Sequence, residues 1–140
     1  MRIFPDANIL FSAAKSDGAI RSFLALLIKA GHTLAADLYV VEEARRNIEL
    51  RYPECIGDLE SVLSILQCSP AVFDPGALEP SCPLPQKDRP VLAGAVALGC
   101  EILVTGDSTH FGPYFGKTVQ GVLVLSPRGL AEYLNLRSTD

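Results

Sequence analysis

The stretch DRPVLAGAVALGCEILVTGD, residues 88–107, predicts one helix followed by one strand. Asp88 is a suitable N-cap, and Pro90 falls in the first turn of the expected helix, where its missing N–H removes no hydrogen bond. The helix is expected to end near Leu98, and residues 102–105 then form a short apolar run typical of a buried strand. A helix that leads into a buried strand is typical of α/β proteins.

The same alternation of strands and helices extends over the rest of the chain. The expected strands are residues 2–4, 33–36, 71–73, 102–105 and 122–125. The expected helices are residues 8–14 with Asn8 as N-cap, 19–30, 38–52, 54–67, 88–98 and 127–135. Residues 74–85, rich in Pro and Gly, form the one long loop. The pattern predicts an α/β fold in which helices cover both faces of a mainly parallel sheet, with residues 1–140 as a single domain.

The composition is that of a globular protein without a strongly basic surface. The chain has 140 residues, 49% hydrophobic and 20% charged, with a formal net charge of −4. This balance argues against non-specific nucleic-acid binding, which needs many Lys and Arg contacts to phosphate. No secretory leader is visible, and the apolar stretches around residues 23–28 and 91–99 are shorter than the roughly 20 residues that cross a bilayer. We therefore expect a cytoplasmic protein with no membrane contact.

The four cysteines are scattered. Cys55, Cys68, Cys82 and Cys100 form no C-x-x-C pair and have no histidine close in sequence, so they do not predict a zinc site. A chain with this much apolar residue does not need disulfides to fold. We expect reduced, mostly buried thiols.

Three acidic side chains are expected at one edge of the sheet. Asp6 follows the first strand directly, and Asp107 follows the strand of residues 102–105. Asp88 opens the helix that leads into that strand. Ligands of open α/β sheets bind outside the carboxyl ends of the strands, so these carboxylates are predicted to meet there.

The helix of residues 38–52 offers a fourth acid, either Glu42 or Glu43. The apolar stripe of this helix consists of Val40, Val41, Ala44 and Ile48. At about 100° per residue, Glu42 lies opposite the stripe and points to solvent, whereas Glu43 lies at its flank and can lean over the edge of the sheet. Glu43 is the better candidate.

Carboxylates that converge on one point repel each other unless a cation lies among them. Such oxygen ligands suit Mg²⁺ or Mn²⁺, ions that polarise a phosphodiester and generate hydroxide from water. Three of the acids also have a structural explanation of their own: Asp88 as an N-cap, Asp107 as a turn residue and Glu43 as a solvated helix charge. No structural role is evident for Asp6.

With these blocks of residues in place, the sequence resembles the PIN-domain (PilT N-terminus-like) nucleases, which include the VapC-type toxins. The blocks are DANIL at 6–10, VEEARRNI at 41–48, KDRPVLAGA at 87–95 and LVTGD at 103–107 followed by His110-Phe111. The resemblance implies a three-layer α/β/α sandwich and cleavage of single-stranded RNA. It also implies Mg²⁺ or Mn²⁺ held by Asp6, Glu43, Asp88 and Asp107. In a toxin–antitoxin pair the nuclease is typically a homodimer silenced by a small antitoxin protein.

Further polar residues surround these acids. Asn8 and Thr105 match positions that orient the metal ligands in the resembling family. Lys87 and Arg89 flank Asp88, close enough to contact an RNA backbone, and His110 follows Asp107 closely enough to touch substrate. A turn that packs Phe111 into the core also explains His110. Arg45, Arg46 and Arg51 fit a solvated helix face as well as a phosphate contact.

Other classes of function stay open. The main alternative is a non-catalytic interaction module that keeps the fold without the chemistry. A dehalogenase-like phosphatase needs a second Asp where this chain has Asn8, and a receiver domain needs a Lys after its last strand, where Leu125-Ser126-Pro127 offers none. A dinucleotide-binding fold is disfavoured because no G-x-G-x-x-G follows the first strand.

Overall fold

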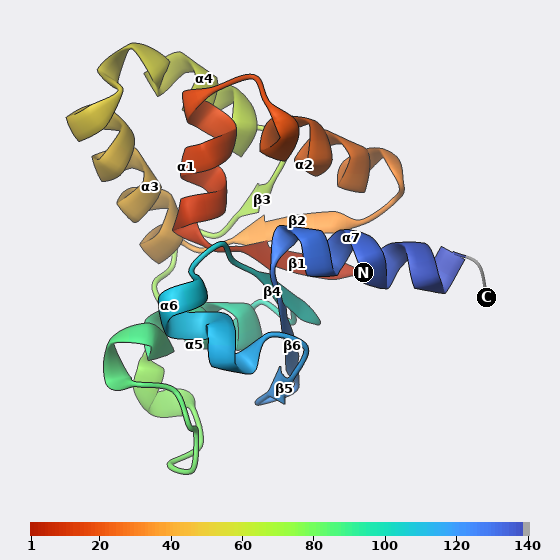
Figure 1. The fold of residues 1–140 in the computed structure, drawn as a ribbon. Coiled ribbons are helices and arrows are strands. Elements are labelled where there is room, and N and C mark those ends of the chain that lie inside the picture. The colour runs from red at the N-terminus through yellow and green to blue at the C-terminus, as the bar shows by residue number, and fades with distance from the viewer. Residues whose placement is uncertain (139–140) are drawn as a thin grey trace.

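The structure, a computed structural model, describes residues 1–138 and has a six-stranded sheet at its centre (Figure 1). The strands are β1 (Arg2–Pro5), β2 (Thr33–Ala36), β3 (Gln67–Cys68), β4 (Ile102–Val104), β5 (Thr118–Val119) and β6 (Val122–Leu125). Their order is β3-β2-β1-β4-β6-β5, and all neighbouring pairs are parallel except β5 with β6. The predicted α/β fold with a mainly parallel sheet is confirmed.

Helices cover both faces of the sheet, as predicted. They are α1 (Ala7–Lys15), α2 (Ala19–Lys29), α3 (Leu38–Arg51), α4 (Ile56–Leu63), α5 (Arg89–Ala97), α6 (Ser108–Phe111) and α7 (Pro127–Ser138). Figure 1 shows α1, α2, α3 and α4 on one side of the sheet and α5 and α6 on the other. β2 and β3 are added on one side of β1, and the chain then passes through α5 to β4, which pairs with the other side of β1. The strand order therefore reverses between β1 and β4, which is where α/β proteins bind ligands.

The central strands β1, β2, β4 and β6 are buried on both faces. Ile3 and Phe4 are neighbours in β1 and point to opposite faces, yet both are fully buried. The core also takes in Leu10 of α1 and Ile48 of α3, which are likewise fully buried. Because both faces of the central sheet are covered, these four strands are mostly apolar runs, and this explains why they could be located from composition.

The region after α3 differs from the prediction. The helix expected over residues 54–67 is a 3₁₀ turn, Pro53–Cys55, followed by α4, which ends at Leu63. The strand expected at residues 71–73 is wrong: the strand is β3, formed by Gln67–Cys68. Both of its residues are exposed, so no apolar pattern marks this edge strand. The carbonyl of Ala71 instead accepts a hydrogen bond from Leu38 N–H at the start of α3 (3.0 Å).

The N-cap of α1 also differs. Asn8 was expected to cap this helix, but the helix begins at Ala7 and its N-cap is Asp6, whose carboxylate accepts a hydrogen bond from the Ala7 N–H. Asp6 therefore has a structural role, contrary to the interpretation of the sequence. Asp37 caps α3 as a residue ahead of a helix should, accepting from Val40 N–H.

Two small elements were missed, α6 and the antiparallel strand β5, because each is too short to show a period. The cysteines are all free, as predicted, but only Cys82 and Cys100 are buried. Across residues 1–138 no helix combines the length and the apolar character needed to span a bilayer.

Candidate active site

The reversal in strand order places Asp6 beside Thr105. Pro5 pairs with Val104 across β1 and β4, and the Asp6 N–H donates to the Val104 carbonyl (2.9 Å). The Asp6 carboxylate is almost buried, with 5% of its residue surface exposed. Its Oδ1 accepts from Ala7 N–H (2.7 Å), and its Oδ2 accepts from the Thr105 hydroxyl (2.9 Å) and from Asn8 Nδ2 (3.2 Å). The two ends of the central strands thus hold this carboxylate in one orientation.

Asn8 and Thr105 extend the same network to the loop after β4. The Asn8 Nδ2 lies 3.2 Å from Thr105 Oγ1, and Asn8 Oδ1 accepts from Gly106 N–H (2.8 Å). Thr105 Oγ1 also accepts from the backbone N–H of Asp107 (3.1 Å). One hydroxyl therefore links the first acid to the last.

Asp107 and Asp88 both approach the same nitrogen of the His110 ring. His110 Nδ1 is 2.7 Å from Asp107 Oδ2 and 3.7 Å from Asp88 Oδ1. Asp107 also caps α6 by accepting from the His110 N–H (3.0 Å). Asp88 is buried and precedes α5 without making a side-chain cap, and its Oδ2 has no hydrogen-bond partner within residues 1–138. A buried carboxylate oxygen without a protein partner is available to a ligand or a cation.

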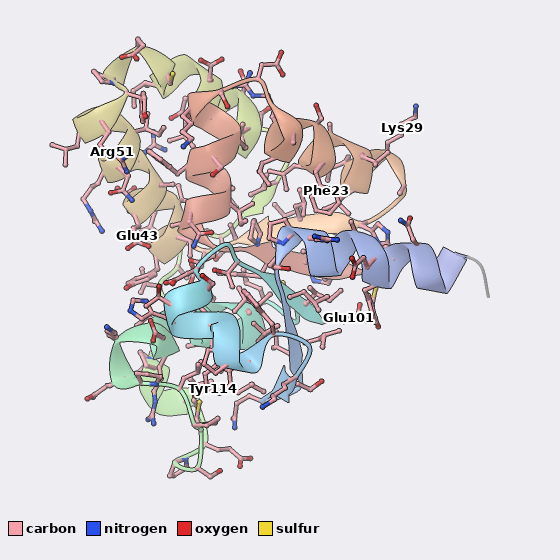
Figure 2. The ribbon with its side chains drawn as sticks, in the orientation of Figure 1. Phe23, Lys29, Glu43, Arg51, Glu101 and Tyr114 are labelled. Carbon is pink, nitrogen blue, oxygen red and sulfur yellow. The ribbon has the colours of Figure 1, made fainter. Side chains whose placement is uncertain are left out.

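Glu43 reaches the same place from α3. Figure 2 labels it at the end of α3 nearer α6. It lines a cleft of about 400 Å³ together with Asp6, Asp88 and Asp107, whereas Glu42 does not. The remaining lining residues are Ala7, Asn8, Phe11, Tyr39, Asn47, Arg51, Lys87, Val91, His110 and Phe111. The structure therefore brings all four predicted acids to one cleft at the carboxyl edge of the sheet.

The acids influence one another's ionisation. Burial raises the pKa of Asp6 to about 6, against the lowering effect of its hydrogen bonds with Thr105 and Ala7, and the charges of Glu43 and Asp107 add to the increase. For Asp107, burial also raises the pKa, but its contacts with His110 outweigh that effect and leave the pKa below its ordinary value. A buried acid near pKa 6 that faces other carboxylates is a site where a cation stabilises the charged form.

The donor set fits an oxygen-preferring divalent cation. All four acids are carboxylates, no cysteine lines the cleft, and Asp88 Oδ2 is unpaired. In the conformation described, however, no three acidic, His or Cys side chains of residues 1–138 lie close enough together to enclose an ion. Asp88 and Asp107 both approach His110 Nδ1, and a closed metal shell requires a small shift of the acidic side chains toward one another.

The basic residues singled out in the sequence have different surroundings. Lys87 and His110 line the cleft. The Arg89 guanidinium is outside the lining and donates instead to the carbonyls of Leu84 and Cys82 (both 2.9 Å). Arg45 pairs with Glu60, as expected of a solvated helix face.

From the sequence, Arg51 was expected as a phosphate contact or a solvated helix charge, whereas Tyr39 and Asn47 were missed on the side of the cleft formed by α3. Tyr39, Asn47 and Arg51 line it together with Glu43. These four residues are spaced four apart, which places them along one ridge of a helix. That spacing is the signal in the sequence that could have found them.

The comparisons with known proteins agree with the fold. No protein-family model matches the sequence, and no curated protein matches it. A chain of VapBC2 from Rickettsia felis, solved bound to a DNA fragment from the promoter, is similar in structure with a TM-score of 0.66 and 18% identity over 90% of this chain and 98% of that one. For VapBC-1 from nontypeable Haemophilus influenzae the TM-score is 0.61, with 13% identity over 91% and 99%.

A third similar structure is Mycobacterium tuberculosis VapC20, described as a sarcin–ricin loop cleaving toxin. Its TM-score is 0.50, with 12% identity over 84% of this chain and 98% of that one. Each comparison spans nearly the whole of the other chain. At these identities the likeness establishes the fold, which is that of the PIN domain.

Proposed function

We propose that this chain, which has the PIN fold of the VapC proteins, is a Mg²⁺- or Mn²⁺-dependent endoribonuclease that cleaves single-stranded RNA. One observation carries the proposal. Four carboxylates, contributed by four separate segments, line a single cleft where the strand order reverses, and one of their oxygens is buried and unpaired. A purely structural role accounts for a cap at one or two of these positions but not for their convergence.

Asp6, Glu43, Asp88 and Asp107 would hold the ion or ions. A bound Mg²⁺ or Mn²⁺ supplies Lewis-acid polarisation of the phosphodiester and a water that ionises near neutral pH. The residues of the chain set the orientation and the ionisation of the carboxylates. Thr105 and Asn8 fix the rotation of the Asp6 carboxylate, and the ionised form that a cation needs predominates above pH 6, because the Asp6 pKa is about 6.

Two side chains are suited to contact the RNA. Lys87 is exposed, lines the cleft and adjoins Asp88, so its ammonium can approach a phosphate oxygen beside the bond that is cut. His110 lines the cleft with its Nδ1 held by Asp107, which leaves Nε2 as the ring nitrogen available to a ligand. Arg89 was a further candidate for this role, but its hydrogen bonds to the loop before α5 commit it to structure.

By the same reasoning we propose that the chain is the toxin of a toxin–antitoxin pair, acts in the cytoplasm as a homodimer, and is silenced by a small protein. The support is the likeness to two VapBC structures and to a VapC toxin described as cleaving the sarcin–ricin loop. Light scattering of the purified chain tests the dimer. Rescue of growth by co-expression of a small protein encoded beside this one tests the antitoxin.

One observation favours a second function, a non-catalytic interaction module with the PIN fold. The four acids do not form a closed metal shell among the described residues, and Nδ1 of His110 contacts Asp107 and approaches Asp88 instead. A domain that had lost its chemistry could keep such an arrangement.

The deciding experiment incubates the purified chain with labelled single-stranded RNAs in Mn²⁺, in Mg²⁺ and in EDTA. Asp6→Asn is the test variant, and Asp17→Asn, an exposed acid in the turn after α1, is the matched control. We expect cleavage that needs metal, disappears in Asp6→Asn and persists in Asp17→Asn. Thermal unfolding with and without Mn²⁺ accompanies it. Absence of both cleavage and Mn²⁺ stabilisation would reject the nuclease in favour of the interaction module.

A further inference from the structure

Beyond the acids, Phe11 and Arg51 of the cleft lining belong to a group of two cations and two aromatic rings, here called the cation–aromatic cluster: Lys15, Arg51, Phe11 and Tyr52. The Arg51 guanidinium carbon lies 5.1 Å from the centre of the Phe11 ring and 5.9 Å from that of Tyr52. Lys15 Nζ lies 5.4 Å from the Phe11 ring centre, and the two rings are 5.7 Å apart. Both cations are exposed while Phe11 is buried, so the rings form a base on which the charges rest.

This cluster lies at a fixed distance from the acids. Glu43 and Arg51 belong to the same ridge of α3, and both line the cleft. Figure 2 shows them on α3, with Glu43 toward the sheet and Arg51 toward the far end of the helix. Eight residues of helix correspond to about 12 Å along the axis. A stacked strand of DNA advances about 3.4 Å per nucleotide, so the cluster lies roughly three to four stacked nucleotides from the acids, and fewer if the strand is extended.

The donors of Arg51 are free to bind a ligand. Five arginines of the described residues donate to protein acceptors, namely Arg2, Arg21, Arg45, Arg89 and Arg128, whereas Arg46, like Arg51, makes no such hydrogen bond but lies outside the cleft lining. Within residues 1–138, Arg51 makes neither a hydrogen bond nor an ion pair, and its described contacts are with the two rings only. Two aromatic faces thus hold a guanidinium in place while all of its N–H groups remain available.

We propose that Arg51, assisted by Lys15, binds a backbone phosphate of single-stranded RNA a few nucleotides from the bond that is cut. This inference rests on the proposed nuclease function and adds a contact that selects for substrate length. The net charge of −4 and the four acids of the cleft repel an RNA strand. Arg51 in the cleft lining and Lys15, which contacts the same Phe11 ring, offset that repulsion. Phe11 and Tyr52 are positioning residues, because they contact the guanidinium and not the strand.

The test measures RNA binding without cleavage. Fluorescence anisotropy follows a labelled 12-nucleotide single-stranded RNA in Mg²⁺ as NaCl is raised, with Asp6→Asn as the inactive parent. Each phosphate contact contributes about 0.7 to the slope of log affinity against log salt for single strands. We expect Arg51→Gln to weaken binding about 5- to 10-fold and to lower the slope by about 0.7, while Arg51→Lys keeps the slope. Lys29→Gln also removes one positive charge, at the far end of α2, and its affinity and slope should match those of the parent.

The outcomes separate this inference from the proposed function. If Arg51→Gln and Lys29→Gln give the same slope and affinity, or if the parent binds no RNA, the inference is overturned. The cluster would then bind an acidic protein segment or contribute only to packing. Circular dichroism of each variant confirms that it is folded, and Arg51→Lys guards against an effect of lost packing. A slope that depends on Arg51 in a protein that cuts no RNA would uphold the phosphate site while rejecting the nuclease.

Discussion

Replacing Asp6 with Asn should stabilise the metal-free protein at neutral pH. The Asp6 pKa is about 6 in the folded chain, mainly because of burial, and about 3.8 when unfolded. A raised folded-state pKa means that stability is greatest below pH 3.8 and is lost as the pH rises through 6. The loss amounts to about 3 kcal/mol at pH 7.5 and about 1 kcal/mol at pH 4.5. Asn avoids this loss but replaces one acceptor oxygen with a donor, at a cost of about 1 kcal/mol.

The expected net gain for Asp6→Asn in EDTA is about 2 kcal/mol at pH 7.5, or roughly 6–10 °C in Tm, and near zero at pH 4.5. Calorimetry of both proteins at the two pH values measures it, with Asp17→Asn as a control expected to change little. Excess Mn²⁺ should reverse the order by stabilising only the wild type, by about 2.7 kcal/mol at 100 times its Kd. A variant less stable than wild type in EDTA at pH 7.5, by the same margin at both pH values, would refute the reasoning.

Three further changes test individual contacts. Gly94→Ala should destabilise the chain by about 2–3 kcal/mol in urea denaturation, because a Cβ there would lie 2.3 Å from Oδ2 of the buried Asp37. Thr105→Val should reduce cleavage at pH 6.5 more than at pH 8.5, because loss of its hydroxyl raises the Asp6 pKa further; an equal reduction at both pH values would contradict this. Arg89→Gln should lower the free energy of unfolding by about 1–2 kcal/mol and speed proteolysis of the loop before α5, because two hydrogen bonds to that loop are lost. Its RNA affinity should stay within about 2-fold of wild type, because Arg89 lies outside the cleft lining.

The parts of the fold that could be predicted are those where one physical signal is strong. The second strand was placed at residues 33–36 and the last long strand at 122–125, and both are observed there. Each is an apolar run bounded by residues that stop a strand. At residues 67–68 the strand is two exposed residues whose pairing with β2 depends on tertiary contact, so no local pattern could reveal it.

The site divides in the same way. Parallel strands end at a common edge, so Asp6 and Asp107 could be placed together from their positions after strands, and helical geometry favoured Glu43 over Glu42. What could not be predicted is which contacts the arginine side chains of α3 make. Arg45 and Arg51 lie on the same helix, and nothing in the sequence distinguishes their roles. In the structure Arg45 pairs with Glu60, whereas Arg51 contacts the rings of Phe11 in α1 and of Tyr52 at the end of α3. Only the packing of those helices distinguishes them.

The double role of Asp6 links folding to chemistry. As the N-cap of α1 it accepts hydrogen bonds that hold its carboxylate still, and the same burial that makes the cap rigid raises its pKa. The ionised Asp6 carboxylate therefore lowers the stability of the folded, metal-free protein, and the charges of Glu43 and Asp107 increase that loss. A divalent cation would recover that loss on binding, since it stabilises the charged form of all the acids together. The affinity for metal and the instability of the metal-free chain thus have one cause, so a substitution that relieves the instability should also weaken metal binding.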